Sequence, residues 1–280
     1  MSSYHVWKAF KYMLISTLAF TLLNVTVKYL SNTPVFQIVF FRASGTLVFT
    51  LSLLKIKKIN IWGENKHLLW LRSIVGLTSM LLFFYSLKYL SVGSAVSIRY
   101  TSPIFAAILA LFLLKEKINR WQWMCFAVAF FGVVLLKSTY FQFSTFGLVL
   151  LVLSAFFSGL VYIIIRRIGN REHPLVVVNY FMGISAIIGA IFSIGNWQPP
   201  SSVELVLLLS LGVYGFLGQL YMTKAFQVEQ TNIVAPFKYI EVIFSILFGV
   251  VWFGDTYSLL SVMAIALILI GLIFNVKFRT

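Results

Sequence analysis

The segment Ile98–Glu116 reads IRYTSPIFAAILALFLLKE, and a later segment, Phe237–Asp255, reads FKYIEVIFSILFGVVWFGD. At a constant offset of 139 residues, charged and aromatic positions of the first segment recur in the second. The aligned pairs are Arg99 with Lys238, Tyr100 with Tyr239, and Glu116 with Asp255. Similarity at a fixed offset indicates an internal duplication. The chain is therefore predicted to consist of two tandem halves, residues 1–140 and 141–280.

The composition around these segments is typical of a membrane protein. Of the 280 residues, 60% are hydrophobic and 10% are charged, whereas a soluble domain usually carries about 25% charged residues. The net charge of +15 could indicate a nucleic-acid partner. We reject that interpretation because the basic residues lie mostly between long apolar stretches. A lipid-facing surface accounts for both features.

Crossing about 30 Å of hydrocarbon takes a helix of about 20 mainly apolar residues. The stretches lack the alternation of a membrane β-barrel, so an all-α integral membrane protein with ten transmembrane helices is predicted. The predicted spans are Ala9–Val27, Val35–Leu54, Leu68–Leu87, Val92–Leu114, Trp121–Leu136, Phe146–Ile165, Leu175–Ile194, Val203–Phe226, Ile233–Phe253 and Tyr257–Val276.

The basic residues predict how these helices are oriented. With the N-terminus in the cytoplasm, fifteen Lys and Arg residues fall on the cytoplasmic side and three on the outside. This bias follows the positive-inside rule and places both termini in the cytoplasm. Each half has five helices, an odd number, so the second half is inverted relative to the first. Inverted repeats are typical of secondary transporters, which bind their substrate near the bilayer midplane.

The order of short motifs resembles a known family. The first half contains, in order, Arg72–Gly76, Phe84–Leu90, Tyr100–Phe105 and Leu113–Glu116, and the second contains Ala225–Phe226, Ile233–Pro236, Tyr239, Phe253–Asp255 and Gly271. This arrangement resembles two EamA repeats of the drug/metabolite transporter superfamily. The resemblance implies ten helices, two cytoplasmic termini, and a central cavity lined by the first four helices of each half. It leaves the substrate open, since members carry amino acids, nucleotide-linked compounds, vitamins, organic acids and drugs.

Charged residues inside predicted spans are the natural candidates for a substrate site, because each costs about 2.5–3.5 kcal/mol at a helix centre on insertion scales. Arg99 replaces the apolar residue more usual in the family. Arg99 and Lys238 are related by the repeat, so they would flank one cavity. Arginine offers a planar fork to a carboxylate or phosphate and lysine a point charge. An anion site is one interpretation; snorkelling or pairing with protein carboxylates is the other.

Three further charged residues lie in spans. Glu241 stands three residues after Lys238, on the same helix face, and is either its counter-ion or a proton-coupling site; the spacing favours the counter-ion. Arg42 lies near the middle of the second span, where a structural and a substrate-facing role are equally compatible with the sequence. Arg72 lies one turn from the cytoplasmic end, where we expect it to snorkel to the headgroups.

Neutral polar residues complete the candidate substrate site. Tyr100 and Tyr239 adjoin the two cations at matching positions, and Asn24 and Gln219 also lie within spans. Each could hydrogen-bond a ligand or simply bond across helices. The predicted substrate-binding set is Arg99, Lys238, Arg42, Tyr100, Tyr239, Glu241, Asn24 and Gln219.

The sequence contains no enzyme motif, and no metal or cofactor is predicted. The single cysteine, Cys125, excludes an intramolecular disulfide framework. The favoured function is a secondary transporter in a bacterial inner membrane that moves a small anionic metabolite by alternating access, with proton or exchange coupling, as a monomer or homodimer. Three alternatives remain: an exporter of amphipathic or zwitterionic compounds such as amino acids or drugs, a flippase for lipid-linked phosphates, and a non-transporting scaffold.

Overall fold

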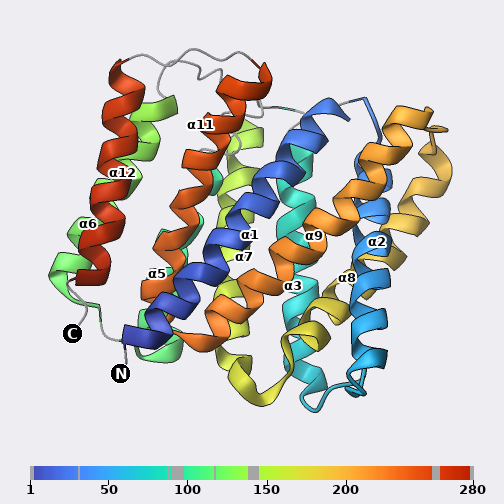
Figure 1. Ribbon diagram of the computed structural model, residues 1–280, viewed down its shortest axis with the longest axis horizontal. Helices are drawn as coiled ribbons and strands as arrows, with labels where there is room; N and C mark the ends of the chain where they lie inside the picture. Colours follow the sequence, from blue (N-terminus) through green and yellow to red (C-terminus); the bar gives the residue numbers. More distant parts are fainter. Residues whose placement is uncertain are drawn as a thin grey trace.

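The computed structural model describes residues 3–30, 32–86, 89, 98–116, 118–137, 145–253 and 259–277. Every regular element within these ranges is a helix, and the helices run roughly alongside one another (Figure 1). The described part of the chain is thus an all-helical bundle, as the composition predicts.

Residues before 138 form the first group of helices. Its long helices begin and end close to the predicted apolar spans. They are α1 (Ser3–Tyr29), α2 (Val35–Ile56), α3 (Lys66–Ser86) and α6 (Arg120–Lys137). Between α3 and α6, the described chain forms α5 (Ser102–Leu109), which continues into the π-helical turn η1 (Ala110–Leu114). The first part of the predicted span Val92–Leu114 lies outside the described residues.

Residues after 144 form the second group. Its long helices are α7 (Thr145–Ile168), α8 (Pro174–Ser193), α9 (Ser202–Val228), α11 (Ile240–Phe253) and α12 (Leu259–Lys277). Short 3-10 turns follow α7 and α8, at η2 (Gly169–Arg171) and η3 (Ile194–Asn196). The predicted span Ile233–Phe253 is not one continuous α-helix. It opens with α10 (Thr231–Val234) and the 3-10 segment η4 (Ala235–Tyr239), where Pro236 lacks the amide hydrogen that a regular α-helix would use.

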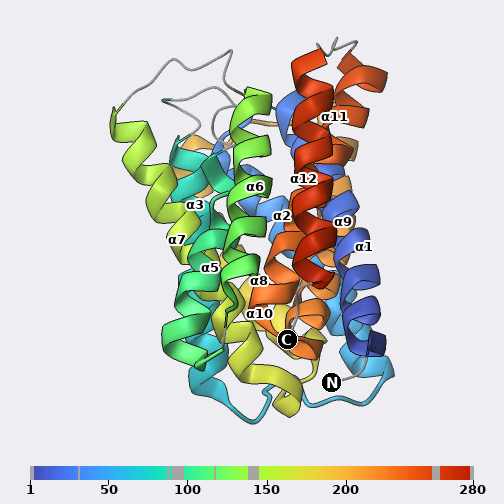
Figure 2. The ribbon, with the colours of Figure 1, turned by 90° about the vertical axis from the view of Figure 1, so that its left-hand side faces the viewer.

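Six of the described helices are long and apolar enough to cross a membrane: α1, α2, α3, α7, α8 and α9. The chain is therefore an integral membrane protein, while the full count of ten spans stays a prediction. Helix α1 begins and α12 ends at the same end of the molecule, which we call the terminal end (Figures 1 and 2).

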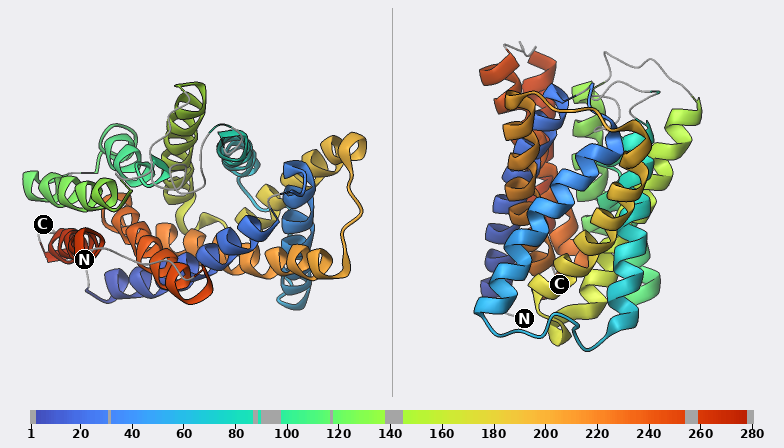
Figure 3. Two further views of the ribbon diagram at one scale, coloured as in Figure 1. Left: turned by 90° about the horizontal axis from the view of Figure 1, so that it is seen from above. Right: turned by 90° about the vertical axis from the view of Figure 1, so that its right-hand side faces the viewer.

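The strongest helix pairs each join one element of the first group to one of the second. Helix α6 packs on α12, α2 on α8, α1 on α9, and α3 on α7. Further pairs are α2 with α9, α3 with α8, α5 with α7, and α1 with α11. Seen along the helices, α6 and α12 stand together at one edge of the molecule, and α2 and α8 lie toward the opposite edge (Figure 3). The two groups are therefore interleaved rather than placed side by side as separate bundles.

A pair of glycines lets α2 and α9 approach closely. A Cβ atom added to Gly212 would lie 2.6 Å from the Cα atom of Gly45, and the reciprocal distance is 2.7 Å. Since backbone atoms cannot move aside as a flexible side chain would, neither position has room for a larger residue. Small residues at helix interfaces are the usual basis of close packing in membranes.

We predict that Gly212→Ala lowers the melting temperature of the detergent-solubilised protein, because overpacking costs about 1–3 kcal/mol. The matched control is Gly183→Ala in α8, where an added Cβ meets nothing within 4 Å. That control should leave the melting temperature unchanged or slightly raised, since alanine favours a helix over glycine. Equal melting temperatures for the two variants would contradict the close α2–α9 packing.

Candidate functional site

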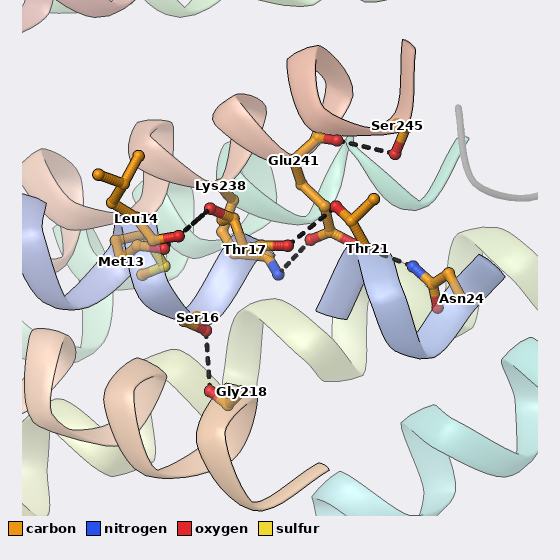
Figure 4. A network of polar contacts seen from close by, with 10 residues as sticks. All are labelled: Met13, Leu14, Ser16, Thr17, Thr21, Asn24, Gly218, Lys238, Glu241 and Ser245. Carbon is orange, nitrogen blue, oxygen red and sulfur yellow. Dashed lines mark hydrogen bonds and ion pairs between the residues drawn. The ribbon is translucent and has the colours of Figure 1, made fainter. Parts of the chain in front are cut away.

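Lys238 and Glu241 form an ion pair in the interior of the bundle (Figure 4). The Lys238 ammonium donates to Glu241 Oε2 at 2.7 Å, and Asn24 Nδ2 of α1 donates to Glu241 Oε1 at 3.0 Å. The exposed fractions of Lys238 and Glu241 are 8% and 5%. Lys238 also stands 4.7 Å from the ring centroid of Phe20 on α1. The structure thus brings Asn24, Lys238 and Glu241 together, and the counter-ion expected for Lys238 is in place.

The helical turn that joins η4 to α11 brings Lys238 and Glu241 together. Lys238 lies in the 3-10 segment η4 and Glu241 in the first turn of α11, so three residues of chain bring both side chains to one face. Ser245, one turn further along, donates to the Glu241 carbonyl oxygen at 2.7 Å. A buried ion pair whose remaining atoms are hydrogen-bonded offsets much of its desolvation cost. The positive charge of Lys238 is therefore largely neutralised within the protein.

Tyr100 and Tyr239 meet in space. Their ring centroids are 6.4 Å apart with an interplanar angle of 50°. These residues occupy the same position of the repeated segment, so equivalent residues from the two groups of helices come into contact. Tyr239 is fully buried, and its hydroxyl has no hydrogen-bond partner among the described residues. An unsatisfied buried hydroxyl is costly, which makes this atom available to a ligand.

Arg99 belongs to a series of three interacting arginines. It interacts electrostatically with Arg42 of α2, and Arg42 interacts in turn with Arg72 of α3. The guanidinium of Arg99 stacks on the ring of Phe83, 4.3 Å from its centroid. We call Arg42, Arg72 and Arg99 the arginine cluster.

The contacts of Arg42 are with groups that carry no negative charge. Arg42 Nη1 contacts Met80 Sδ at 3.4 Å, while Arg42 Nε has no partner among the described residues. Gly215 of α9 faces this side chain, since an added Cβ there would lie 3.2 Å from Arg42 Cγ. These contacts hold the side chain in place without neutralising its charge.

Arg72 corrects one expectation from the sequence. It does not snorkel to the headgroups, because it is 1% exposed and points into the bundle. Its Nη2 donates to Gln219 Oε1 at 2.9 Å, and its guanidinium lies 4.0 Å from the ring centroid of Phe181. Arg72 Nε and Nη1 have no hydrogen-bond partner in the part of the chain that the structure describes. Gln219, which the sequence predicts as a possible substrate-binding residue, is thus hydrogen-bonded to Arg72, which the sequence predicts to lie at the headgroups.

The arginine cluster has no carboxylate partner among the described residues. The ion pairs found in the described part of the chain are Lys238 with Glu241 and Arg166 with Glu116, and neither involves an arginine of the cluster. Burying a charge without a partner is expensive, so three neighbouring guanidinium groups favour an anion between or beside them. Stacking on Phe83 and Phe181 contributes roughly 0.5–2 kcal/mol for each cation, which does not replace a counter-charge.

A second polar network ties the two groups of helices at the terminal end. The Glu116 carboxylate, just after η1, accepts from the backbone N–H groups of Thr231 at 3.0 Å and Asn232 at 3.1 Å. It also pairs with Arg166 Nε of α7 at 3.9 Å. Arg166 donates in turn to the Gln227 carbonyl oxygen at 3.1 Å. The sequence repeat singled out Glu116, but nothing in the sequence indicated that it caps α10.

The same network reaches the connection between α2 and α3. Gln227 Nε2 donates to the Glu172 carbonyl oxygen at 3.0 Å. The Glu172 carboxylate accepts from the backbone N–H of Glu64 at 2.7 Å and from that of Asn65. Bonds that begin at Glu116 and end at Asn65 therefore pass through α7, α9 and the α7–α8 connection. We call this chain of contacts the terminal latch.

The family model for the EamA-like transporter family matches residues 7–138 and again residues 145–277. The chain belongs to the EamA-like transporter family. Because family members and relatives are transporters, this EamA-like protein is a membrane transporter of small molecules and not an enzyme.

Characterised relatives of this EamA-like transporter have different named functions. It is 28% identical to the pseudopaline exporter CntI of Pseudomonas aeruginosa, over 92% of each chain. It is 27% identical to an S-adenosylmethionine uptake transporter of Rickettsia prowazekii, over 84% of this chain and 80% of that one. Human solute carrier family 35 member G1 is 26% identical, over 87% and 72%. A solved crystal structure with 18% identity has the same fold, with a TM-score of 0.83 over 96% of both chains.

For the ion pair we predict strong coupling. Lys238→Met or Glu241→Gln alone leaves one buried charge without its partner and should cost about 3–5 kcal/mol of stability. The double variant Lys238→Met/Glu241→Gln should lose clearly less than the sum of the two. Thermal unfolding of the four proteins completes the double-mutant cycle, with exposed Lys55→Met as a control for removing a lysine. Additive losses would show that the pair is not coupled.

Proposed function

We propose that this protein is a secondary transporter that carries a small anionic metabolite, an organic acid or a phosphorylated compound, by alternating access through a central cavity. The observation that supports this proposal best is the arginine cluster. It consists of three guanidinium groups from α2, α3 and the segment before α5, and no described carboxylate neutralises them. In a low-dielectric interior, a bound anion is the simplest source of the missing negative charge.

The ligand chemistry follows from the donors present. Arginine presents a planar fork that matches carboxylate and phosphate oxygens in two parallel hydrogen bonds. Arg72 Nε and Nη1 and Arg42 Nε have no described partner and are potential donors. The hydroxyl of Tyr239 adds a neutral donor from the second group of helices. We propose Arg99, Arg42 and Arg72 as the anion-binding residues, with Gln219 positioning Arg72.

Alternating access needs two halves that move about a central site. We propose that these halves are the two inverted five-helix repeats, residues 1–140 and 141–280, with ten spans in total. Two tandem matches to the family model support this division. The helix pairs support it too, because exchanging equivalent helices turns α1–α9 into α7–α3, and α2–α9 into α8–α3. The contact of Tyr100 with Tyr239 fits the same pseudo-symmetry.

We propose that the terminal end faces the cytoplasm of a bacterium, which places the protein in the inner membrane. The excess of basic residues in the loops at this end supports the orientation. In alternating access, contacts between the halves must form and break at each end in turn. The terminal latch joins Glu116 of the first half to α7 and α10 of the second. We assign it the role of holding the cytoplasmic end closed in this conformation.

A zwitterionic substrate is the second candidate, and a specific observation favours it. Glu241 and Arg99 carry opposite charges, and both interact electrostatically with Tyr100, whose ring contacts that of Tyr239. An amino acid or related compound carries both an ammonium and a carboxylate. This candidate also suits a family whose relatives include an S-adenosylmethionine uptake transporter. A zwitterionic ligand would have to displace Lys238 from Glu241, whereas an anionic substrate would leave that ion pair intact.

The proposal is tested with purified protein in liposomes and a panel of radiolabelled organic acids, phosphorylated compounds and amino acids. We expect uptake of at least one anion and a melting temperature raised by it, because a ligand at 100 times its dissociation constant stabilises the native state by about 2.7 kcal/mol. Uptake confined to zwitterions would favour the second candidate. Scrambling of labelled lipid without solute uptake would instead indicate a flippase, and the absence of both activities a scaffold.

For the transported anion, we predict that Arg99→Ala or Arg72→Ala raises the dissociation constant about tenfold to a hundredfold. A hydrogen bond to a charged group contributes roughly 1.5–3 kcal/mol, which corresponds to that range. Arg99→Lys should be intermediate because it keeps the charge but loses the fork. Arg167→Ala, an exposed arginine at the end of α7, is the control. Normal anion affinity in folded Arg99→Ala and Arg72→Ala would contradict the anion site.

The terminal latch predicts a pH dependence. Burial raises the pKa of the Glu116 carboxyl in the closed form, with a smaller contribution from Glu229, while the bonds from Thr231 and Asn232 and the charge of Arg166 act in the opposite direction. Opening this end would expose the carboxyl to water and return its pKa toward the ordinary value. The closed form therefore binds the proton more tightly, so its advantage is present at low pH and fades as pH rises through the raised pKa.

We predict that acidification from about pH 7.5 to about pH 5 increases the closed population. Spin labels at the exposed positions Lys115 and Arg167, in a Cys125→Ser background, would report this as a larger fraction of the short distance. Glu116→Gln mimics the protonated carboxyl and should abolish the response. If Glu116→Gln responds to pH as the parent does, Glu116 is not the titrating group of the latch.

A further inference from the structure

A cavity of about 370 Å³ opens at the terminal end, apart from the arginine cluster. The polar residues of its lining come from α1, α9 and the α7–α8 connection: Tyr12, Asn170, Glu172, His173, Lys224 and Gln227. None of them belongs to the predicted substrate site. We call this cavity the Lys224 pocket.

The Lys224 ammonium has aromatic neighbours and no described carboxylate partner. It lies 4.8 Å from the ring centroid of Tyr221 and 5.6 Å from that of Tyr12. Lys8 also lies 6.0 Å from the centroid of the Tyr12 ring. The charges of Lys57 and Lys8 both act on Lys224. Lys224 is therefore the cation of the pocket lining, and two nearby lysines repel it.

The carboxylate in the lining does not balance them. Glu172 Oε1 already accepts the backbone N–H groups of Glu64 and Asn65. Its other carboxylate oxygen, Oε2, faces Gly63, where an added Cβ would lie 2.7 Å away. The Glu172 carboxylate is thus hydrogen-bonded to the α2–α3 connection and does not pair with Lys224, so the pocket keeps an excess of positive charge.

His173 adds a neutral hydrogen-bond donor. Its Nδ1 accepts the backbone N–H of Leu175 at 3.2 Å, at the start of α8. That bond leaves Nε2 to carry the ring proton. Partial desolvation, together with the charges of Lys57 and Lys224, lowers the pKa of the His173 imidazole. At neutral pH the ring therefore donates from Nε2, and the Asn170 side chain supplies a further amide.

The surroundings place this pocket at the depth of lipid headgroups. Tyr4 and Trp7, in the first turns of α1, are 63% and 57% exposed. Lys8 and Lys11 stack on these two rings. Aromatic residues and lysines with exposed tips are typical of the membrane–water interface. Basic pockets between spans at the cytoplasmic side suit phosphate headgroups.

We propose that the Lys224 pocket binds the phosphate group of an anionic phospholipid headgroup. The ammonium of Lys224 pairs with the phosphate, Asn170 and His173 donate to its oxygens, and the rings of Tyr4, Trp7 and Tyr12 contact the glycerol and the first methylenes. This inference does not depend on the identity of the transported solute, because the two sites share none of these residues.

The test compares lipid binding by native mass spectrometry of the detergent-solubilised protein with added phosphatidylglycerol or phosphatidylcholine. We expect tighter binding of phosphatidylglycerol and a higher melting temperature with it. Lys224→Ala should weaken that binding about tenfold or more, in line with the loss of a charge-assisted hydrogen bond. Asn170→Ala, at an exposed loop position, should weaken it less and serves if Lys224→Ala fails to fold.

The control is Lys55→Ala, an exposed lysine at the same end of the molecule that does not line the pocket. It should leave phosphatidylglycerol binding unchanged. An equal loss in Lys55→Ala would show general attraction to positive charge rather than a site. Binding of inorganic phosphate to the Lys224 pocket as tightly as phosphatidylglycerol would show a soluble-anion site. Either result, or normal lipid binding by both Lys224→Ala and Asn170→Ala, would overturn the proposal.

Discussion

A charged side chain in hydrocarbon has no water to solvate it, and this constraint governs the interior of the bundle. Lys238 and Glu241 meet it by pairing at 2.7 Å, with Asn24 completing the carboxylate's hydrogen bonds. The arginine cluster meets it in a different way. Arg42, Arg72 and Arg99 rest on sulfur, amide and aromatic groups, which hold the cations in place without neutralising them. A fold that keeps three such groups together gains from a bound anion, and this is the physical basis of the anionic substrate that we propose.

Close helix packing supports that arrangement. The Gly45–Gly212 contact brings α2 and α9 together, and these helices carry Arg42 and Gln219. Gly215, one turn along α9, leaves room for the Arg42 side chain. Because every strong helix pair joins the first group of helices to the second, movement of one group must rearrange many contacts at once. The terminal latch supplies the polar contacts at one end, while bonds such as those of Arg72 with Gln219 and Asn24 with Glu241 join the two groups elsewhere.

The relatives illustrate how one fold carries different solutes. A solved structure with 18% identity keeps the whole architecture, while relatives named as a pseudopaline exporter and an S-adenosylmethionine uptake transporter share just over a quarter of their residues with this chain. Fold alone does not fix function. In this protein, substrate specificity would rest on a few polar side chains in the interior of the bundle. The terminal latch and the Lys224 pocket, at the terminal end, are separate features.

Hydrophobic stretches, the repeat and the basic residues were enough to predict the helical membrane fold, because backbone groups in lipid must be satisfied within each segment. The three-residue spacing of Lys238 and Glu241 predicted their ion pair, because side chains three residues apart lie on the same face of a helix. Contacts between distant segments were beyond the sequence. Arg72 has the position of a snorkelling residue, yet Gln219 and Phe181, more than a hundred residues away, hold it inside the bundle. Glu116 caps α10, and Arg99 interacts with Arg42 of another helix, because the rotation and crossing of packed helices decide which side chains meet.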